Sequence, residues 1–548
     1  MNNTILENEA LNSKNMKQEN TTSLTSKQAW EDIQNDEEML QDFETSILPP
    51  YMNTCRWFAG KARLQEKFTI KYAMEIPIKD SIALLFVIEV RYGDGETENY
   101  LLPISFIDST YTQEIAPKGI ITLAYINEKR GLVVDAIYDE RFQQALFSHV
   151  AQAENVSQKE NGKIEFHRGK GLAGEDIKGI ISSKVLPVDS SNSAMTFGQF
   201  PLRNKYFLKL YRKLFEETNP EVDMVEFITE NSDFAYIPAF AGSIVWKREG
   251  KPDVTLGMMQ RMVENEADSW VQTGEQLDSF VQAFTDKTFS IEENFFDQVE
   301  LLAQRTAEMH LALYVPEADE MFAPEHFNDD YRQFIHKRLT DLLERRYNLL
   351  IDNYSKMTDP VTQKLAWDFM ESKELIDEFA KEILTKGIDS QRIRIHGDYH
   401  LGQVLATKND YIIIDFEGEP ESTIIDRKIK HSPLKDVAGM IRSYHYAISA
   451  KMFNDPETAK LDPARVQTAA DRWYKLIQQT YMEKYLDTFG KPHPLFKNNN
   501  EVNFLLLIYL LEKAVYELGY EISYRPDWVK IPLKGIVNVI REIEKVAL

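Results

Sequence analysis

Two aspartates and one glutamine in segment 392–420 have the residue types and the spacing that phosphoryl transfer requires. Asp398 follows a short apolar stretch in the sequence His-Gly-Asp, and Gln403 comes five residues later. Asp415 directly follows a second apolar stretch, 411–414. A loop carboxylate can accept the proton of a substrate hydroxyl, which accelerates a reaction roughly 10²- to 10⁴-fold. An amide and a second carboxylate supply oxygen ligands for Mg²⁺. The segment therefore predicts a site where a hydroxyl nucleophile meets a metal-bound nucleotide.

A structural role is the alternative for each of these residues taken alone. His-Gly-Asp is a common turn sequence, and its aspartate can stabilise its own loop. The order Asp398, Gln403 and Asp415 across strand, loop and strand is more specific, because a solvated loop does not need an apolar strand to deliver its carboxylate. We therefore predict Asp398 as the base and Gln403 with Asp415 as metal ligands.

The composition argues against nucleic-acid and membrane partners. Lys plus Arg number 63 and Asp plus Glu number 87, so the net charge is −24, the wrong sign for binding a phosphate backbone. The longest apolar run, 504–511, is far shorter than the roughly 20 residues that span a bilayer, and the N-terminal segment has no apolar signal region. The single cysteine, Cys55, fits a reducing compartment. We expect a cytoplasmic protein.

Hydrophobic periodicity divides the chain into three regions after a polar tail. The expected parts are a disordered tail over 1–26, a small α+β domain over 27–160, a β-rich lobe over 161–263 and a helical lobe over 264–548. The α+β domain should begin with a helix over 28–47 that Pro49-Pro50 ends. The β-rich lobe should contain one helix, which opens at Asn219-Pro220. The helical lobe should contain long helices, among them 361–384, 463–489 and 502–520.

The nucleotide must be held by the β-rich lobe upstream. The loop 189–193, which includes Ser191, Asn192 and Ser193, joins two expected strands and offers small hydroxyls and amides to phosphates, although an ordinary hairpin is the commoner structure for such a turn. Lys209 lies in the next strand and can reach the α and β phosphates, whereas most isolated strand lysines face solvent. A carboxylate of the following helix, Asp223 or Glu226, would orient its ammonium.

Several motifs resemble those of the bacterial maltokinases, which belong to the aminoglycoside-phosphotransferase and eukaryotic-like kinase superfamily. The resemblance runs from about residue 48 to the C-terminus. Its most specific motifs are HGDYHLGQ at 396–403, DFEGEP at 415–420 and HSPLKDVAGM at 431–440. Supporting motifs are RWF at 56–58, SNS at 191–193, LKLYR at 208–212, NPEVD at 219–223 and the stretch from YE at 516–517 to RP at 525–526. The EGEP extension narrows the resemblance from the superfamily to the maltokinases.

The resemblance implies a bilobal, protein-kinase-like α+β fold with a β-rich N-lobe, a helical C-lobe and an N-terminal α+β cap domain. It implies ATP and Mg²⁺ as cofactors and maltose as acceptor, phosphorylated on its anomeric hydroxyl to maltose 1-phosphate in glycogen- or trehalose-linked metabolism. It implies that Lys209 contacts the phosphates and that backbone groups of the strand with Gln260 and Met262 bind adenine. One departure is Asp223, where the family usually has glutamate; the partner of Lys209 therefore stays open between Asp223 and Glu226.

The acceptor pocket is expected on one face of a C-terminal helix. The residues at i, i+3, i+4 and i+7 of this face are Lys513, Tyr516, Glu517 and Tyr520. The resemblance points to this region for maltose, with Arg442 and His400 as further candidates. Leucines between 506 and 510 show that the same helix also buries a core face, so packing is the alternative role for its aromatic residues.

Other conspicuous residues are expected to serve the fold. Trp57 and Phe58 should pack in the core of the cap, and His310 should be a packed histidine near the catalytic loop. Asp268, or Asn265, should cap the first helix of the helical lobe. Asp436, at the start of a helix, has the residue type of an N-cap.

Two other functions fit parts of the sequence. A kinase for another sugar, an amino sugar or an aminoglycoside would share the nucleotide machinery and differ only in the pocket. A catalytically silent subunit that binds a partner such as trehalose synthase through the cap is the non-enzymatic alternative. Such a subunit would be free to lose Lys209, Asp398, Gln403 and Asp415. A protein kinase fits less well, because little chain separates Asp415 from the next helical segment.

Overall fold

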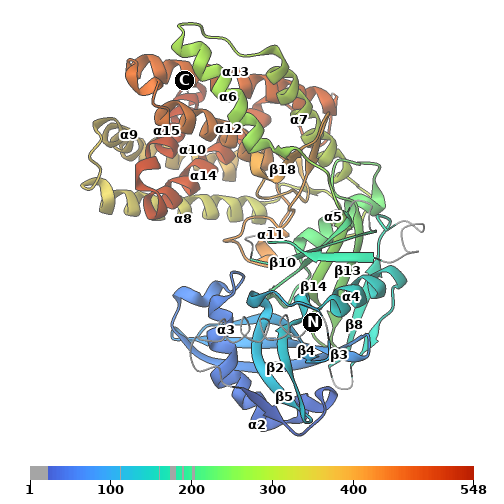
Figure 1. Ribbon diagram of the computed structural model, residues 1–548. Coiled ribbons are helices and arrows are strands. Elements are labelled where there is room, and N and C mark those ends of the chain that lie inside the picture. Colours follow the sequence, from blue (N-terminus) through green and yellow to red (C-terminus); the bar gives the residue numbers. More distant parts are fainter. Residues whose placement is uncertain are drawn as a thin grey trace. The chain divides into compact units, whose positions relative to one another are not determined.

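The computed structural model describes residues 23–111, 113–158, 161–172, 181–187, 191–199, 204–490 and 492–547 (Figure 1). The chain forms two compact units. One unit comprises residues 1–219 and 240–262 and is rich in strands, and the other comprises 220–239 and 263–548 and is mostly helical. The second segment of the strand-rich unit ends at Met262, and the expected boundary between a β-rich and a helical lobe after residue 263 stays a prediction. The helix after Asn219, expected inside the β-rich lobe, belongs to the helical unit by its contacts.

The β-rich unit contains two sheets. The first has the order β1-β5-β6-β4-β3-β2, with β12 beside β4, and the second has the order β7-β8-β13-β14-β11-β10-β9. The strands of the first sheet are β1 (Leu24–Ser26), β2 (Gln65–Ile78), β3 (Ser81–Tyr92), β4 (Thr97–Asp108), β5 (Ile120–Ile126), β6 (Lys129–Asp135) and β12 (Lys213–Leu214). Those of the second are β7 (Val156–Ser157), β8 (Lys163–Arg168), β9 (Ile181–Val185), β10 (Ser193–Gln199), β11 (Asn204–Leu210), β13 (Phe240–Lys247) and β14 (Val254–Arg261).

The first sheet is buried on both faces, which explains the continuous apolar sequence of its inner strand β3, between β4 and β2. Alternate side chains point to opposite faces of a strand. Leu84 and Phe86 belong to a core that includes Trp57 and Phe58 and the helices α2 (Glu37–Asp42) and α3 (Leu48–Thr54). Leu85 and its neighbours on the other face pack in a second core with α4 (Glu140–Gln152) and strands of the second sheet. The predicted packing of Trp57-Phe58 is thereby confirmed.

A buried ion pair joins the two sheets. The Arg212 guanidinium donates to the Asp135 carboxylate at 2.6 Å and to the Leu101 carbonyl at 3.2 Å. Both charged side chains are almost inaccessible to solvent. Asp135 ends β6 of the first sheet and Arg212 follows β11 of the second. The two sheets are therefore held together by a contact whose loss would leave an unpaired buried charge.

Two expectations for the N-terminal region were wrong. The predicted helix over 28–47 is broken into a 3₁₀ helix, α2 and a π-helical turn, and the chain then continues in α3 through Pro49-Pro50. The prolines are tolerated because they lie in the first turn of α3, where a missing N–H breaks no helical hydrogen bond. Residues 24–26, expected to belong to the disordered tail, form β1 because the buried Leu24 packs in the core beside β5.

The helical unit contains the following helices: α5 (Pro220–Asn231), α6 (Ser269–Thr285), α7 (Glu293–Ala312), α8 (Asp329–Tyr354), α9 (Pro360–Glu371), α10 (Lys373–Thr385), α11 (Ile424–Arg427), α12 (Leu434–Asn454), α13 (Pro463–Phe489), α14 (Asn499–Tyr524) and α15 (Lys530–Ala547). Short strands accompany them: β15 (Ala267–Asp268), β18 (Val404–Ala406) and β19 (Tyr411–Ile413) in one sheet, and β16 (Glu325–His326) with β17 (Gln391–Arg392) in another. The long helices α8 and α14 pack side by side (Figure 1).

The predicted helices of this unit are present with one interruption. Helix α13 has the predicted bounds, and Asp268 caps α6 by accepting a hydrogen bond from the Val271 amide, as expected. The predicted helix 361–384 consists of α9 and α10, which are separated at Ser372. The Ser372 hydroxyl bonds back to the Asp368 carbonyl, and such a bond offers the backbone an alternative to continuing the helix.

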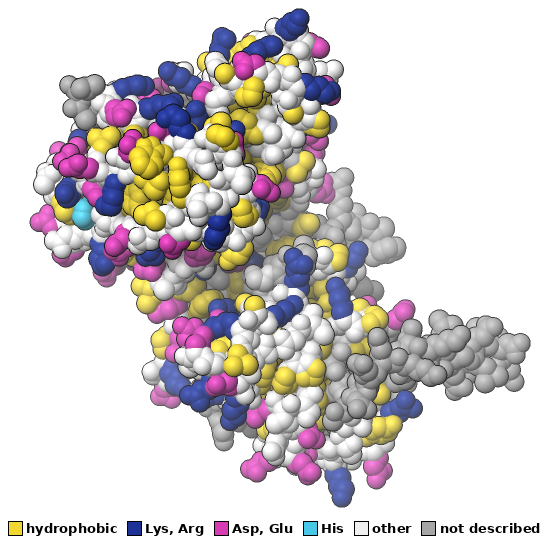
Figure 2. Space-filling model, turned by 90° about the vertical axis from the view of Figure 1, so that its left-hand side faces the viewer, with side chains coloured by type: hydrophobic (Ala, Val, Ile, Leu, Met, Phe, Trp, Pro, Cys, Tyr) yellow, Lys and Arg dark blue, Asp and Glu magenta, His cyan; other side chains and the backbone are white. Residues whose placement is uncertain are grey.

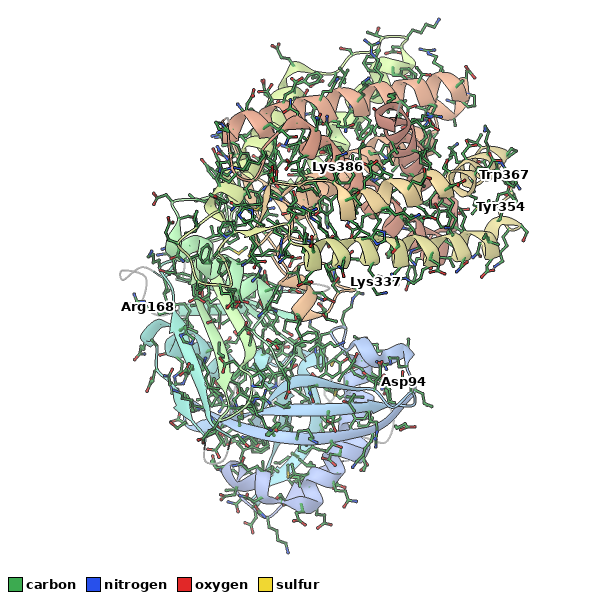
Figure 3. The ribbon with its side chains drawn as sticks, turned by 180° about the vertical axis from the view of Figure 1, so that it is seen from behind. Asp94, Arg168, Lys337, Tyr354, Trp367 and Lys386 are labelled. Atoms are coloured by element: carbon green, nitrogen blue, oxygen red, sulfur yellow. The ribbon has the colours of Figure 1, made fainter. Side chains whose placement is uncertain are left out.

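Hydrophobic side chains gather on one face of the helical unit (Figure 2). The large apolar residues most exposed around the α8–α9 junction are Ile351, Val361 and Trp367, the last labelled in Figure 3.

Among the described helices, none combines the length and the hydrophobicity that crossing a membrane would require.

Candidate active site

The loop that carries Asp398 is fixed by a buried aspartate. The amides of His396 and Gly397 donate to the two carboxylate oxygens of Asp436, at 2.7 and 2.9 Å. Gly397 has φ of +88°, a backbone conformation that glycine adopts without strain and that lets both amides face the same carboxylate. Helix α12 begins at Leu434 after Pro433, so Asp436 lies in its first turn and is not the N-cap that was predicted. Its carboxylate holds the loop that carries Asp398 in place.

His310 completes this anchor. Its Nε2 lies 3.1 Å from the Asp436 carboxylate and its Nδ1 lies 2.8 Å from the Tyr485 hydroxyl, and the ring is fully buried. This confirms the expected packed histidine near the catalytic loop. Burial alone would raise the pKa of Asp436, but the hydrogen bond and charge of His310, together with the backbone amides, hold it below its ordinary value. Asp436 is therefore a carboxylate at neutral pH, able to accept all three hydrogen bonds.

The segment that carries Asp415 is hydrogen-bonded to the loop that carries Asp398. The Ile414 carbonyl accepts from His396 Nε2 at 2.9 Å, and the Ile414 amide donates to the Gln403 carbonyl at 3.0 Å. The Gln403 side-chain amide then donates to Asp415 Oδ2 at 2.9 Å. Asp415 has φ of +66°, rare for a residue other than glycine and typical of functional sites. The structure thus brings Gln403 and Asp415 into direct contact, as their spacing predicted.

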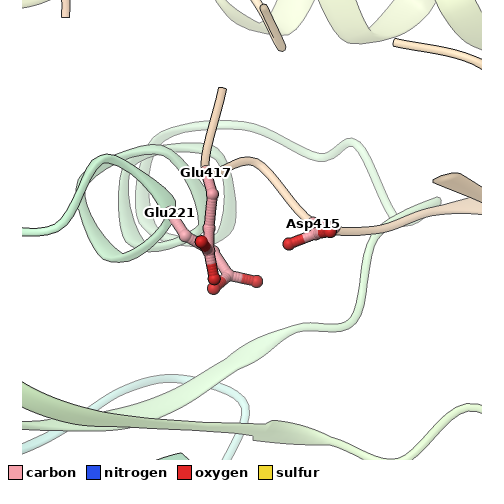
Figure 4. A group of neighbouring side chains, drawn as sticks. All are labelled: Glu221, Asp415 and Glu417. Carbon is pink, nitrogen blue, oxygen red and sulfur yellow. The ribbon is translucent and has the colours of Figure 1, made fainter. Parts of the chain in front are cut away.

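Two further carboxylates lie close to that of Asp415. Oxygen atoms of Glu221, Asp415 and Glu417 all lie within 4.8 Å of one another, and the Glu221 side chain is buried (Figure 4). Hard cations such as Mg²⁺ are bound by oxygen ligands of this kind. The sequence analysis missed Glu221 and Glu417. Glu417 was visible only as part of the EGEP motif, and Glu221 comes from α5, about 190 residues earlier, so no local pattern connects it with Asp415.

The two proposed partners of Lys209 have their own surroundings in the helical unit. Asp223 forms an ion pair with Lys428 at 2.9 Å. Glu226 is half-buried, and its pKa is raised by burial and by the nearby carboxylates of Asp223 and Glu230. Which of them orients Lys209 stays a prediction.

A cavity of about 290 Å³ lies beside Asp398 within the helical unit. Its walls come from α8, α14, the catalytic loop and the segment 419–426. Its charged lining consists of Arg338, Arg345, Arg346, Lys435 and Lys513 on the cationic side, and Asp398, Glu419, Glu421, Asp426 and Glu512 on the anionic side. Cations and anions are equal in number, so the cavity as a whole favours neither an anionic nor a cationic ligand.

Lys513 faces Asp398 in this cavity. Its Nζ lies 3.1 Å from Asp398 Oδ1, while His400 Nε2 lies 4.0 Å from Oδ2. Burial would raise the pKa of Asp398, but the Lys513 ammonium and then His400 outweigh it, so the pKa lies below the ordinary value. Burial would lower the pKa of Lys513, and the Asp398 and Glu517 carboxylates raise it. The pair is therefore a carboxylate beside an ammonium at neutral pH, and Asp398 is ionised as a base must be.

The other acceptor candidates lie in different places. The buried Arg442 pairs with Glu517 at 2.5 Å and bonds His445 at 2.9 Å, and neither Arg442 nor Glu517 lines the cavity. Tyr520 is 44% exposed and packs against Tyr524 and Arg525, outside the cavity lining. His400 contacts Asp398 and accepts from the Gly402 amide. Of the predicted acceptor residues, the structure brings Lys513 and Tyr516 into the cavity wall.

The candidate nucleotide residues lie in the second sheet of the β-rich unit. Lys209 is the second-last residue of β11, opposite Ala194 on β10 and Met258 on β14. Gln260 pairs with Phe207, and the Met262 amide donates to the Lys205 carbonyl at 2.9 Å.

The predicted phosphate loop is only partly described. Residues 189 and 190 lie outside the described residues. Asn192 and Ser193 both accept hydrogen bonds from Arg212, at its amide and its Nε respectively. These two side chains therefore help to seat the Arg212–Asp135 ion pair, and contact of the loop, including Ser191, with phosphate stays a prediction.

Comparisons with known proteins agree with this architecture. Residues 51–139 match the maltokinase N-terminal cap domain. Glucosamine kinase of Streptacidiphilus jiangxiensis is 27% identical over 152 residues, which are 27% of this chain and 32% of that protein. Glucosamine kinase of Mycolicibacterium smegmatis (strain ATCC 700084 / mc(2)155) is 29% identical over 157 residues, which are 27% of this chain and 34% of that protein. The matched segments thus span about a third of these curated relatives.

The whole fold also has a solved counterpart. A structure of glucosamine kinase in complex with glucosamine, ADP and inorganic phosphate superposes with a TM-score of 0.61 at 16% identity, and the match covers 89% of this chain and 98% of that one. At this identity the likeness shows a common fold. The predicted cap domain and the predicted kinase-like fold, with its strand-rich and helical parts, are confirmed.

Proposed function

We propose that this chain, which joins a maltokinase-type cap domain to the fold of glucosamine kinase, transfers the γ-phosphate of ATP to the anomeric hydroxyl of maltose and yields maltose 1-phosphate. The observation that carries the proposal is the position of Asp398. Its loop is fixed by Asp436, its carboxylate is kept ionised by Lys513, and it opens onto a cavity of about 290 Å³. A sugar hydroxyl bound there would donate its proton to Asp398 as it attacks phosphorus.

The carboxylates around Asp415 support Mg²⁺ as the metal. Asp415 and Gln403 would be ligands, with Glu221 or Glu417 as further oxygen donors or as acceptors for bound water. Bound Mg²⁺ would neutralise charge on the transferring phosphoryl group. Phosphoryl transfer asks little covalent help from the protein, so the chain's contribution is to position the hydroxyl and exclude water.

Replacing Gln403 by leucine is expected to raise the Mg²⁺ concentration for half-maximal activity about 10- to 100-fold. The variant loses a candidate ligand and also the hydrogen bond that orients Asp415. The measurement is a Mg²⁺ titration of the initial rate at saturating ATP and maltose. Gln467→Leu is a matched control, because Gln467 makes the same amide-to-carboxylate bond, to Asp471, on α13. A Gln403→Leu enzyme with wild-type Mg²⁺ dependence would contradict the assignment.

The cavity favours a neutral polyol over an amino sugar. The acceptor hydroxyl must approach Asp398, and the Lys513 ammonium already lies 3.1 Å from that carboxylate. A second ammonium on the acceptor would be repelled by Lys513, and the equal numbers of cations and anions in the lining give it no net attraction. Glucosamine is the second candidate, because the curated relatives are glucosamine kinases.

An acceptor panel separates these functions. With ATP and Mg²⁺, we expect the highest kcat/KM for maltose, lower values for glucose and the lowest for glucosamine, measured by coupled detection of ADP. The phosphorylated hydroxyl is then identified by NMR of the product, and the anomeric position is expected. Preference for glucosamine would assign the second candidate. If no ADP is released with any sugar in the panel, the result would instead favour the silent subunit.

A further inference from the structure

Arg346 lies in the cavity wall without an internal partner. The residues that the structure describes provide neither a hydrogen bond nor an ion pair to its guanidinium, and its Nε is buried. Burial and the neighbouring Arg345 lower its pKa, although the Glu421 carboxylate counteracts them. A guanidinium carries five N–H donors in a rigid plane, and a buried donor such as Arg346 Nε that has no acceptor is costly unless a ligand satisfies it.

The chain makes room for this arginine with a glycine. A Cβ built on Gly519 would stand 2.0 Å from Arg346 Nε and 2.1 Å from its Cζ. The guanidinium therefore lies directly against the backbone of α14, where only glycine leaves space. Gly519 is in the middle of a helix, where glycine costs about 1 kcal/mol relative to alanine. That cost and the unsatisfied Nε are two independent signs that the position of Arg346 serves a ligand.

The position of Arg346 along the cavity indicates which part of a bound acceptor it would contact. Arg338 on α8 contacts Glu512 on α14 at 2.9 Å, next to Lys513 and hence to Asp398. Arg346 and Gly519 lie eight and seven residues farther along the same two helices. At 1.5 Å per residue they are about 10 to 12 Å from the Arg338–Glu512 contact. This is a separation that a second sugar ring, joined to the ring at Asp398, would span.

From this geometry we propose that Arg346 binds hydroxyl groups of the acceptor ring farther from Asp398, and so makes the site prefer a disaccharide to a monosaccharide. Vicinal hydroxyls match the parallel N–H donors of a guanidinium. Tyr516 and Glu421, which also line the cavity and interact electrostatically with Arg346, supply acceptors for the same ring. The inference rests on the proposed kinase function and adds a residue that sets acceptor length.

The test compares maltose with glucose in the full-length enzyme. Arg346→Met is expected to raise KM for maltose about 10-fold or more, because hydrogen bonds from a charged donor are lost, and to leave kcat and the KM for glucose unchanged. Arg346→Lys should fall between, since an ammonium lacks the planar fork. Gly519→Ala should reproduce Arg346→Met without removing the charge, and the double variant should be no worse than either single variant.

Lys337→Met is the matched control, because Lys337 is on the same helix, 76% exposed and outside the cavity lining (Figure 3). Its constants for both sugars should equal those of the wild type. Equal losses for maltose and glucose in Arg346→Met would overturn the inference while leaving the kinase function intact. Titration calorimetry without ATP decides the case if no sugar is turned over: maltose bound as tightly by Arg346→Met as by the wild type also overturns it.

Discussion

Asp398→Asn is expected to lower kcat for maltose about 10²- to 10⁴-fold, the range that a general base contributes. The amide has the shape of the carboxylate but cannot take the proton of the acceptor hydroxyl. The loop should keep its position, because its amides are held by Asp436 and not by Asp398. Binding of ATP and of maltose should therefore persist, as measured by calorimetry beside steady-state kinetics. A variant with wild-type kcat would exclude Asp398 as the base.

Asp426→Asn is the matched control, because it removes a carboxylate from the same cavity and leaves the base in place. It is expected to alter KM more than kcat.

Lys513→Met gives a complementary pH profile. Lys513 is the main group that lowers the pKa of Asp398 against the effect of burial, so its removal should raise that pKa. The base is then protonated at higher pH, and the acid limb of kcat/KM should move upward in pH.

Local sequence signals explain which elements could be predicted. Helix α13 follows Asp462, which caps it, has Pro463 in its first turn and ends before Gly490, so its bounds were evident from residue types. Gln403 and Asp415 are close in sequence and flank the strand pair β18–β19, so their contact was also predictable. Where a short stretch of chain determines the geometry, its sequence is sufficient.

Residues that act across long sequence separations were assigned incompletely. Asp436 has the residue type of an N-cap, but its partners are amides 40 and 39 residues earlier, and nothing near it in sequence names them. Helical spacing placed Tyr520 on the face of Lys513, yet two turns along α14 that face leaves the cavity wall. The buried position of Arg442 depends on Gly535 of α15, since a Cβ there would stand 2.0 Å from its guanidinium. Periodicity gives a face but not the neighbour that covers it.

The anchor of the catalytic loop makes the second large prediction. Asp436→Ala is expected to destabilise the helical unit by about 3–5 kcal/mol, because it leaves two amides and a histidine nitrogen buried without acceptors. It should also lower kcat strongly, since the loop that holds Asp398 loses its support. Stability is measured by urea unfolding followed by helical circular dichroism, and activity is measured in the folded fraction at low temperature. Asp359→Ala is the matched control: Asp359 also accepts two backbone amides, but at the exposed start of α9, where loss of a cap costs about 1 kcal/mol and should leave kcat unchanged.

The ionisation of Asp436 determines how the stability that it contributes changes with pH. Its pKa in the folded protein lies below the ordinary carboxyl value, despite full burial, because His310 and the loop amides favour the anion. The stabilisation is therefore fully present at neutral pH and is lost as the pH falls through the folded pKa. Asp436→Asn can accept only through one oxygen, so it should be less stable than the wild type at pH 7, and the difference should shrink in acid. If Asp436→Asn is less stable than the wild type by the same amount at pH 7 and in acid, Asp436 does not act as a carboxylate. That result would contradict the electrostatic contribution of Asp436 to the loop, and it would leave the assignment of Asp398 as the base unchanged.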